Sequence, residues 1–255
     1  QTVANWTYIP AADSFYFAGY EDLYPKIGDY DFNDLTVAYR VAKGLNAAGE
    51  LVAIRGTAYL ITRGAAYSHD WHLKFDLPAG PLANLTCTFQ RAPGAANQPC
   101  AAVNAAQTNG SADVTVFANT SSIFKDSGAP SGFTHTVPGR AFIQGPKATF
   151  SLELAAPVAA NSIAPPFNAY LHVRNTGQII QLLEVNPTFR DANGFPFGML
   201  MPANWQPPDE GDHLMDAYSS FLDYVTSQGA KSANWYNTPN ANKVYGIPAS
   251  SVWAW

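Results

Sequence analysis

The sequence predicts a mainly β protein, an antiparallel β-sandwich of jelly-roll-like form with one C-terminal helix. Two observations support this fold class. Apolar and polar residues alternate with a period of two in many short segments, as in DWHLKFDL, where Trp71, Leu73 and Phe75 share one face. Turn-forming clusters of Gly, Pro, Asn and Ser separate these segments. A series of such short strands is typical of sandwiches and jelly rolls.

Seven segments have this strand pattern, and one segment has a helical pattern. The expected strands are 35–41, 51–62, 70–77, 112–118, 148–154, 169–174 and 178–185. Apolar residues recur at helical spacing over 213–228, after the acids Asp209, Glu210 and Asp212 and before Gly229. Acids before the first turn favour the positive end of a helix dipole. We expect this helix to pack on the sandwich.

The composition is that of one folded domain, residues 1–255, without a visible linker or internal repeat. Hydrophobic residues make up 47% and charged residues 13%, about half the usual charged share. The net charge is −5, and no Lys/Arg cluster offers a face for phosphates, so nucleic acid is not an expected partner. No apolar run reaches the roughly 18 residues that a membrane-spanning helix needs.

Several features predict an oxidising, extracellular location. The chain begins at Gln1, as expected after removal of a signal peptide. Cys87 and Cys100 bracket a loop rich in Pro, Gly and Asn, and a disulfide between them is the expected use of two cysteines in a secreted protein. The alternative is two unrelated buried thiols. Four Asn-x-Ser/Thr sequons, which only permit glycosylation, begin at Asn5, Asn84, Asn109 and Asn119.

The candidate metal site is GDYDFNDL, residues 28–35. It gathers side-chain oxygens from Asp29, Asp31, Asn33 and Asp34, and Ca²⁺ takes six to eight oxygen ligands. The spacing of the first three matches the start of an EF-hand loop. The rest excludes an EF-hand, because the sixth position is an Asp instead of Gly and the twelfth is Arg40 instead of Glu. Glu21 and Asp22 are near enough in sequence to add oxygens.

The alternation of side chains between the two faces of a strand also predicts how the backbone runs in residues 29–34. In one continuous strand, Asp29, Asp31 and Asn33 would share the core-facing side with Leu35 and Val37. The backbone must therefore turn within 29–34. Acids gathered in such a turn repel one another unless a cation is bound. The alternative is a solvated turn in which Asp and Asn cap backbone amides.

Three stretches carry a family resemblance. AGYEDLYPKIGDYDFNDLTVAYRV (18–41) resembles the signature of the LruC-type domain, a bacterial secreted or surface domain of the DUF4842 kind. The segments 49–77 and 196–236 are similar to its next hairpin and its closing block. The segment QIIQLLEV departs from the family, where many members carry a polar segment with a His. The resemblance implies an extracellular, calcium-loaded β domain, and it supplies no catalytic residue.

Other groupings were weighed as functional sites. His69 and His72 lie three apart in an expected strand, which places them on opposite faces and disfavours a zinc site. No hydrolase or phosphate-loop signature is present, although Glu21 or Asp22 with Asp209 or Glu210 would supply the two carboxylates of a glycosidase.

Aromatic residues gather late in the chain, either as a ligand or assembly surface or as packing that seals this segment onto the sandwich. They are Trp205, Trp235, Tyr236, Trp253 and Trp255.

These observations predict a secreted, calcium-binding, non-enzymatic structural protein of the cell surface or extracellular space. The alternative is a calcium-dependent carbohydrate-binding module, and glycoside hydrolysis is a remote third. The expected partners are calcium and either copies of the chain itself or a cell-surface glycan. The apolar segments 4–10 and 250–255 are expected to contact a neighbouring copy, or else to fold back on their own sandwich.

Overall fold

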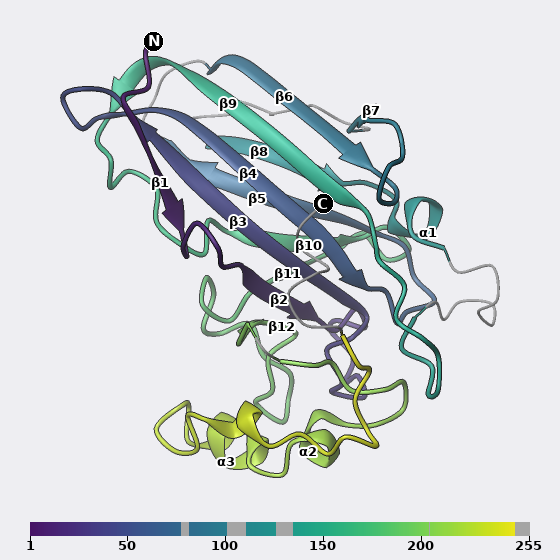
Figure 1. The fold of residues 1–255 in the computed structure, drawn as a ribbon. Helices are drawn as coiled ribbons and strands as arrows, with labels where there is room; N and C mark the ends of the chain where they lie inside the picture. Colours follow the sequence, from purple (N-terminus) through teal and green to yellow (C-terminus); the bar gives the residue numbers. More distant parts are fainter. Residues whose placement is uncertain (78–81, 101–110, 126–134, 204, 248–255) are drawn as a thin grey trace.

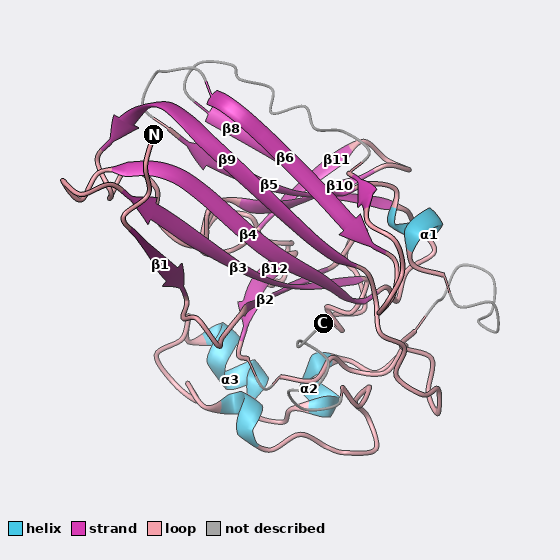
Figure 2. Cartoon of the chain, turned by 45° about the horizontal axis from the view of Figure 1, so that its top comes forward, coloured by secondary structure: helices cyan, strands magenta, loops and turns pink. Residues whose placement is uncertain are grey.

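The computed structural model describes residues 1–77, 82–100, 111–125, 135–203 and 205–247. It confirms the predicted fold class, because the chain is mostly antiparallel β in two sheets with few helices. The sheets form two layers, and the short helices α2 and α3 lie at one end of the molecule (Figures 1 and 2). Among the described residues, no helix is long and apolar enough to cross a membrane.

The larger sheet has the strand order β12-β2-β3-β4-β9-β6-β7, and β1 also pairs with β3. Every ladder in it is antiparallel. Its strands are β1 (Asn5–Ile9), β2 (Tyr16–Tyr20), β3 (Leu35–Leu45), β4 (Leu51–Thr62), β6 (Leu82–Gln90), β7 (Gln98–Pro99), β9 (Lys147–Val158) and β12 (Gly198–Met201).

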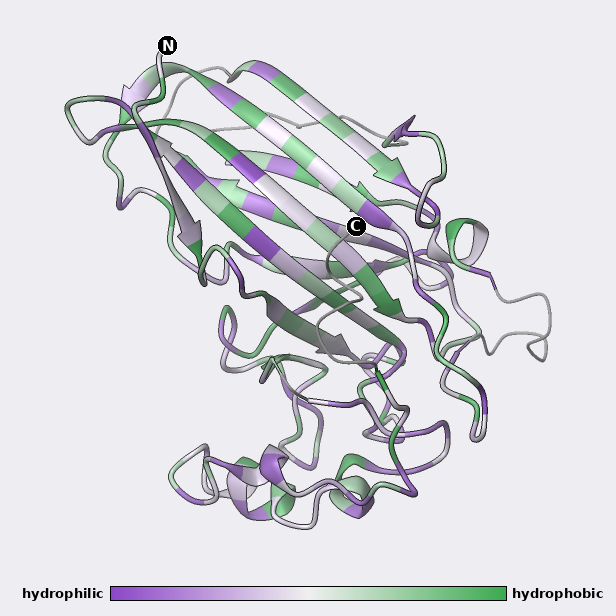
Figure 3. Ribbon diagram, viewed as in Figure 1, coloured by the Kyte–Doolittle hydropathy of each residue, from purple (hydrophilic) through white to green (hydrophobic). Residues whose placement is uncertain are grey.

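The smaller sheet has the order β11-β10-β5-β8 and is also antiparallel. Its strands are β5 (His69–Asp76), β8 (Ser111–Phe117), β10 (Ala169–Val173) and β11 (Gln178–Gln181). The main core lies between the sheets, where Val37, Leu60, Trp71 and Phe150 are members of one buried cluster. This is the packing that the period-two pattern predicts, and Figure 3 shows the alternation along the strands.

All seven expected strands are present; the strand at 51–62 has the predicted ends, and no end of the others is shifted by more than four residues. The strand expected at 178–185 ends at Gln181 because the chain turns at Leu182, which is fully buried in the core. The strands β1, β2, β6, β7 and β12 were not predicted. β2 is buried along most of its length, so it lacks the apolar–polar alternation by which the other strands were found. Segment 4–10 forms β1 on its own sheet, which is the fold-back alternative, and its docking on a neighbouring copy stays a prediction.

The single helix expected over 213–228 is divided in two. α2 spans Leu214–Ala217 and α3 spans Phe221–Thr226. Between them Tyr218 is extended, with φ −137° and ψ 93°. Its buried hydroxyl donates to the carbonyl of Gln206 and accepts the N–H of Gln206, which fixes the chain where one continuous helix would have run. Two more short helices, α1 (Thr120–Ile123) and the 3₁₀ helix η1 (Trp235–Asn237), complete the described structure.

A second buried cluster lies outside the sandwich core. It joins side chains of β2, β4 and β12 to α2, α3 and η1, and it includes Phe17, Tyr59, Met199, Phe221 and Trp235. The helices therefore pack on the sheet, as expected, but through their own aromatic core. This cluster also holds the C-terminal segment against the loop between β2 and β3.

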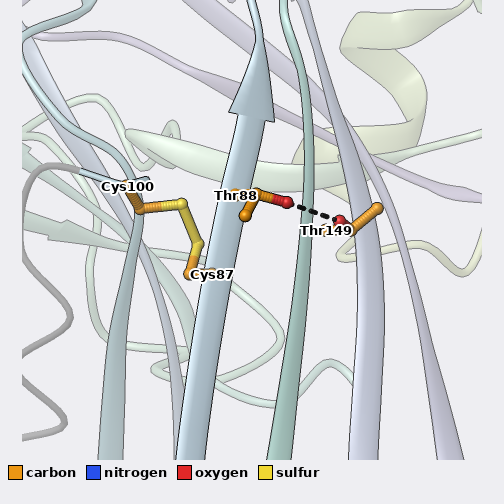
Figure 4. Close-up of a disulfide and its surroundings, with 4 residues drawn as sticks. All are labelled: Cys87, Thr88, Cys100 and Thr149. Atoms are coloured by element: carbon orange, nitrogen blue, oxygen red, sulfur yellow. Dashed lines mark hydrogen bonds between the residues drawn. A yellow bond between two sulfur atoms is a disulfide. The ribbon is translucent and has the colours of Figure 1, made fainter. Parts of the chain in front are cut away.

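The predicted disulfide is present between Cys87 of β6 and Cys100, directly after β7 (Figure 4). The Cα atoms are 5.4 Å apart, and the N–H of Cys100 donates to the carbonyl of Cys87. Both residues belong to the main core. The bond ties the edge strand β7 to the larger sheet.

Candidate metal site

The loop between β2 and β3, residues 21–34, turns as strand parity predicted. Tyr30 has φ 60° and Phe32 has φ 55°, so two residues of the acidic stretch are left-handed. Aromatic residues adopt this conformation rarely, and surrounding contacts must hold them there. In this loop the Glu21 side chain does so, because Oε1 accepts the N–H of Phe32 at 2.6 Å and Oε2 accepts that of Tyr30 at 3.3 Å.

The aromatic residues of the stretch anchor the other side of the loop. Phe32 is fully buried in the second cluster, 6.4 Å from the ring of Phe221. Tyr30 stacks on Phe195 at 4.4 Å, and its hydroxyl donates to Asp191 at 2.5 Å. The alternation of acid and aromatic residues therefore separates the loop into an apolar side, packed on the helices, and an acidic side.

Three carboxylates meet on the acidic side. Glu21, Asp29 and Asp31 each place one oxygen so that all three oxygens lie within 4.8 Å of one another. Glu21 and Asp31 are both 1% exposed. This burial excludes a solvated turn, although the capping part of that alternative is present, since Asp31 accepts the N–H of Asn33 and Asp34 accepts that of Asp22. In the described part of the chain, no Lys, Arg or His forms an ion pair with these three residues.

Gly28 is required by the way the backbone passes this group. A Cβ atom at residue 28 would lie 2.0 Å from Oε2 of Glu21. That oxygen already accepts the N–H of Tyr30 and cannot move without loss of the bond. Any side chain at residue 28 would therefore displace the Glu21 carboxylate.

The electrostatics of the buried acids favour a bound cation. Burial, followed by the charge of Asp29, raises the pKa of Glu21 to about 8 even though two backbone N–H groups oppose this. Burial and then the charge of Glu21 raise the pKa of Asp31 well above its usual range. Burial and the charge of Asp22 do the same for Asp34. Each cause disfavours the ionised form, and a divalent cation would reverse that preference.

A pocket of about 590 Å³ lies beside the three carboxylates. Asp22, Asp29, Asp34 and Glu210 contribute to its walls, together with apolar side chains and His213. Glu210 comes from the C-terminal segment, where its side chain accepts the hydroxyl of Thr136 at 3.3 Å. Burial and then the charge of Asp29 raise the pKa of Glu210 to about 7.

Glu210 and His213 were not predicted as part of this site. From the sequence, Glu210 is a possible glycosidase partner of Glu21 or Asp22 and otherwise belongs to the acidic start of a helix. The spacing gives no sign that a segment some 180 residues away packs on the loop. Backbone bonds make the junction: the N–H of Leu214 donates to the carbonyl of Tyr30 at 2.8 Å. His213 Nδ1 also contacts the carbonyl oxygen of Asp29.

The predicted ligands divide into three groups in the structure. Glu21, Asp29 and Asp31 converge. Asp22 and Asp34 lie in the adjoining pocket, where Asp34 accepts the N–H of Asp22 at 2.7 Å and Asp22 contacts His69 Nε2 at 2.8 Å. Asn33 alone forms the third group.

Asn33 does not take the third EF-hand position. Its amide nitrogen donates to Asp31 Oδ2 at 2.7 Å and to the carbonyl of Pro208 at 3.0 Å. Its Oδ1 is buried and has no hydrogen-bond partner among the described residues. A Cβ atom on Gly64 would lie 2.0 Å from this oxygen and 2.4 Å from Oγ1 of Thr136. Asn33 therefore orients Asp31 and leaves one free oxygen in a polar recess.

The two histidines of HDWH lie apart, as their spacing predicted. His69 is fully buried and binds Asp22. His72 lies on the outer side of β5, where Nδ1 contacts Asp113 at 3.0 Å and the ring stacks on Tyr170 at 4.6 Å. The described residues do not bring the two histidines to a common metal site.

The late aromatic residues that the structure describes pack in the second cluster or against it. Trp205 is 1% exposed and Trp235 is 3% exposed, and both belong to the second cluster. Tyr236 packs against that cluster, with its ring 5.8 Å from that of Trp235. The ligand-surface interpretation is therefore wrong for Trp205 and Trp235, and the sealing role is correct. Trp253 and Trp255 lie outside the described residues.

Two of the four sequon asparagines, Asn5 and Asn84, are exposed on strands of the larger sheet. Asn119 is partly buried, and its Oδ1 accepts the hydroxyls of Ser68 and Ser121. Asn109 lies outside the described residues. Of the three described sequon asparagines, Asn5 and Asn84 therefore present an exposed side chain for modification, and Asn119 does not.

Comparison with known proteins supports the fold and a family relationship. A crystal structure described as a "Putative lipoprotein from Bacteroides ovatus" is similar, with a TM-score of 0.70 and 14% sequence identity. The similarity covers 94% of this chain and 76% of that one. No curated protein matches the sequence. Residues 181–236, which carry α2, α3, Glu210 and His213, match the family described as a domain of unknown function, DUF4842, as the resemblance predicted.

Proposed function

We propose that this chain is a calcium-binding, non-enzymatic protein of the cell surface or extracellular space, in which calcium locks the β2–β3 loop to the C-terminal segment. The observation that carries the proposal is the convergence of Glu21, Asp29 and Asp31, whose oxygens lie within 4.8 Å of one another. Buried carboxylates need a compensating charge. Among the described residues no cationic side chain pairs with them.

The donor set favours calcium over other divalent ions. All three convergent groups are carboxylates, which suit hard cations, whereas zinc and copper sites draw on His and Cys. Glu21 and Asp31 each hold a backbone or side-chain donor, so their oxygens cannot all rearrange into a tight octahedron. Calcium accepts irregular sets of six to eight oxygens at 2.3–2.6 Å, whereas magnesium requires a near-ideal octahedron. Water or a ligand in the adjoining pocket would complete the set.

The role proposed for the ion is structural. Asp29 belongs to the β2–β3 loop, and its carbonyl oxygen contacts His213 just before α2. Glu210 reaches the same pocket from the C-terminal side. An ion held by the loop therefore fixes both segments at once. Removal of calcium should loosen this junction and leave the two-sheet core intact.

The extracellular location is supported by independent features. The Cys87–Cys100 disulfide is typical of oxidising compartments. The similar crystal structure is described as that of a lipoprotein, a class of protein that is anchored at membranes through lipid. The non-enzymatic role rests on the absence of hydrolase and phosphate-loop signatures from the sequence.

Thermal unfolding tests the calcium proposal directly. Because an ion that binds only the folded state must stabilise it, the melting temperature should rise with calcium and fall in EDTA. Asp29→Asn should abolish most of this rise, since it removes one of the three convergent carboxylates, and among the described residues that carboxylate forms no ion pair. Without calcium the same variant should be at least as stable as the wild type, because one repelling charge is lost. Asp76→Asn, at an exposed carboxylate, is the matched control.

A second candidate is favoured by the pocket of about 590 Å³ beside the carboxylates. A glycan with vicinal hydroxyls could occupy it and bind the calcium ion directly, as in a calcium-dependent carbohydrate-binding module. A glycan array probed with calcium and with EDTA separates the two roles. Binding that requires calcium and Asp29 would support the module. If no glycan binds in either buffer and the melting temperature still depends on calcium, the ion has only the structural role.

A further inference from the structure

We propose that the outer face of the larger sheet carries a second, calcium-independent binding site for a carboxylate-bearing polysaccharide. A groove of about 550 Å³ lies there. Trp6 and Tyr8 of β1, Arg40 of β3 and Arg55 of β4 form one end of it, and hydroxyl side chains of β4, β6 and β9 form the rest. The groove is on the opposite side of the sheet from the sandwich core and shares no residue with the acidic pocket.

The positive end of the groove is built around one aromatic ring. The guanidinium carbons of Arg40 and Arg55 each lie 5.2 Å from the centroid of Tyr8. Arg40 is also 4.8 Å from the ring centroid of Phe15, and Arg55 is 4.0 Å from that of Trp6. These cation–π contacts fix both guanidiniums in place. Two like charges on one ring are thus held close together.

No carboxylate neutralises this pair. In the described part of the chain, neither Arg40 nor Arg55 forms an ion pair, although the protein carries a net charge of −5. Each guanidinium has five N–H donors. Arg40 donates to the carbonyl of Ala12, and Arg55 donates to the hydroxyl of Tyr8. The remaining donors are available for an external anion, and the planar guanidinium matches a carboxylate in bidentate form.

The hydroxyls lie in register with the two arginines across the sheet. One row runs from Arg40 to its cross-strand partner Thr57, then to Thr149 and Thr88. The next row runs from Arg55 to Ser151 and Thr86. Figure 4 shows the contact of Thr88 with Thr149, whose hydroxyl oxygens are 3.2 Å apart. Each row thus begins at a guanidinium and continues across the sheet with hydroxyl groups, which both donate and accept hydrogen bonds.

This arrangement fits a polysaccharide better than a peptide. β3, β4 and β9 are interior strands whose backbone groups are already paired on both sides, so a peptide cannot add here as another strand. A sugar chain instead offers hydroxyls to the Thr and Ser rows and an apolar ring face to Trp6 or Tyr8. A uronic acid adds the carboxylate that the arginines lack. The site therefore selects for an acidic sugar chain.

Binding of oligogalacturonate, which carries carboxylates, is compared with binding of its methyl ester, which has the same sugar chain without the charge. Binding is measured by calorimetry on the full chain in EDTA, so that failure of the calcium proposal cannot affect the result. We expect the acid to bind, the ester to bind at least about tenfold more weakly, and affinity for the acid to fall with added salt. Arg40→Gln combined with Arg55→Gln should reduce affinity by at least about tenfold.

Arg91→Gln is the matched control, because Arg91 also lies over a ring, Phe89 at 5.8 Å, and donates to a backbone carbonyl. It should bind as the wild type does. Thr149→Val changes an exposed position and should weaken binding without lowering the melting temperature. This variant keeps the proposal testable if the double arginine variant does not fold. Three outcomes would overturn the proposal: no binding by the wild type, equal binding of acid and ester, or equal binding of single-stranded DNA through the same arginines.

Discussion

Glu21 Oε1 accepts the backbone N–H of Phe32 at 2.6 Å, and this bond connects the end of β2 to the left-handed centre of the acidic loop. One carboxylate thereby has two roles. It holds an unfavourable backbone conformation, and it presents its charge to Asp29 and Asp31. The loop conformation and the candidate metal site therefore depend on the same residue.

Gly28→Ala should disturb this carboxylate without a change of charge. The added Cβ atom would lie 2.0 Å from Glu21 Oε2, so the side chain must move and lose its bond to Tyr30. We expect the free energy of unfolding to fall by about 1–3 kcal/mol and the calcium-induced rise in melting temperature to shrink. Gly246→Ala, where a Cβ atom meets nothing within 4 Å, should change neither quantity. Equal behaviour of the two variants would show that Gly28 has no special role.

The stability of the calcium-free protein should fall as the pH rises from 7 to 9. The pKa of Glu21 is raised from 4.5 to about 8, chiefly by burial, so the folded state holds this proton more tightly than the unfolded state. Its contribution to stability is complete below pH 4.5 and is lost as the pH rises to about 8. Below pH 7 the effect overlaps that of His135, whose pKa burial lowers to about 3.

Calcium should reverse this trend, because the ion binds the ionised carboxylates. The melting temperature in EDTA is compared with that in excess calcium at each pH from 7 to 9, and the difference should grow with pH. Asp29→Asn should flatten the curve in EDTA, since the charge of Asp29 is the second cause of the raised pKa. A melting temperature in EDTA that increases from pH 7 to 9 contradicts the prediction.

Trp235→Phe should lower stability and leave any glycan binding unchanged. Trp235 is 3% exposed and packs edge-on against Phe221 at 4.8 Å and Tyr218 at 5.1 Å. The smaller ring leaves a cavity in the second cluster, at a cost of about 1–2 kcal/mol measured by urea unfolding. Tyr236→Phe, which removes only a hydroxyl at the edge of the cluster, should stay within about 0.5 kcal/mol of the wild type. Loss of glycan binding with full stability would restore a ligand role for Trp235.

Self-association through residues 250–255 stays a prediction, because this segment lies outside the described residues. The physical reason is its apolar, uncharged sequence SSVWAW, since interface cores are rich in aromatic residues and poor in charge. Light scattering with calcium at high protein concentration should show association of the full chain and a smaller mass for a variant that lacks residues 250–255. If both are monomers, association through this segment is excluded.

The sequence by itself determined the fold class and named the three carboxylates, Glu21, Asp29 and Asp31, that converge in the candidate site. Period-two alternation suffices for strands with one buried and one exposed face, such as β5, because burial of one face imposes that pattern. Parity alone also required the turn at residues 29–34, since a straight strand would have placed Asp31 among apolar neighbours. The cysteine pair followed from spacing and the absence of other thiols.

Tertiary structure decided which oxygens meet and which aromatic residues are exposed. Glu210 joins Asp29 only because the second cluster packs the C-terminal segment on the β2–β3 loop, a contact between residues that no local pattern connects. The same packing divides the expected helix at Tyr218 and buries Trp205 and Trp235. The groove of Arg40 and Arg55 depends on strand register across the larger sheet. Local patterns report which side of a strand is buried, whereas long-range packing decides what lies against it.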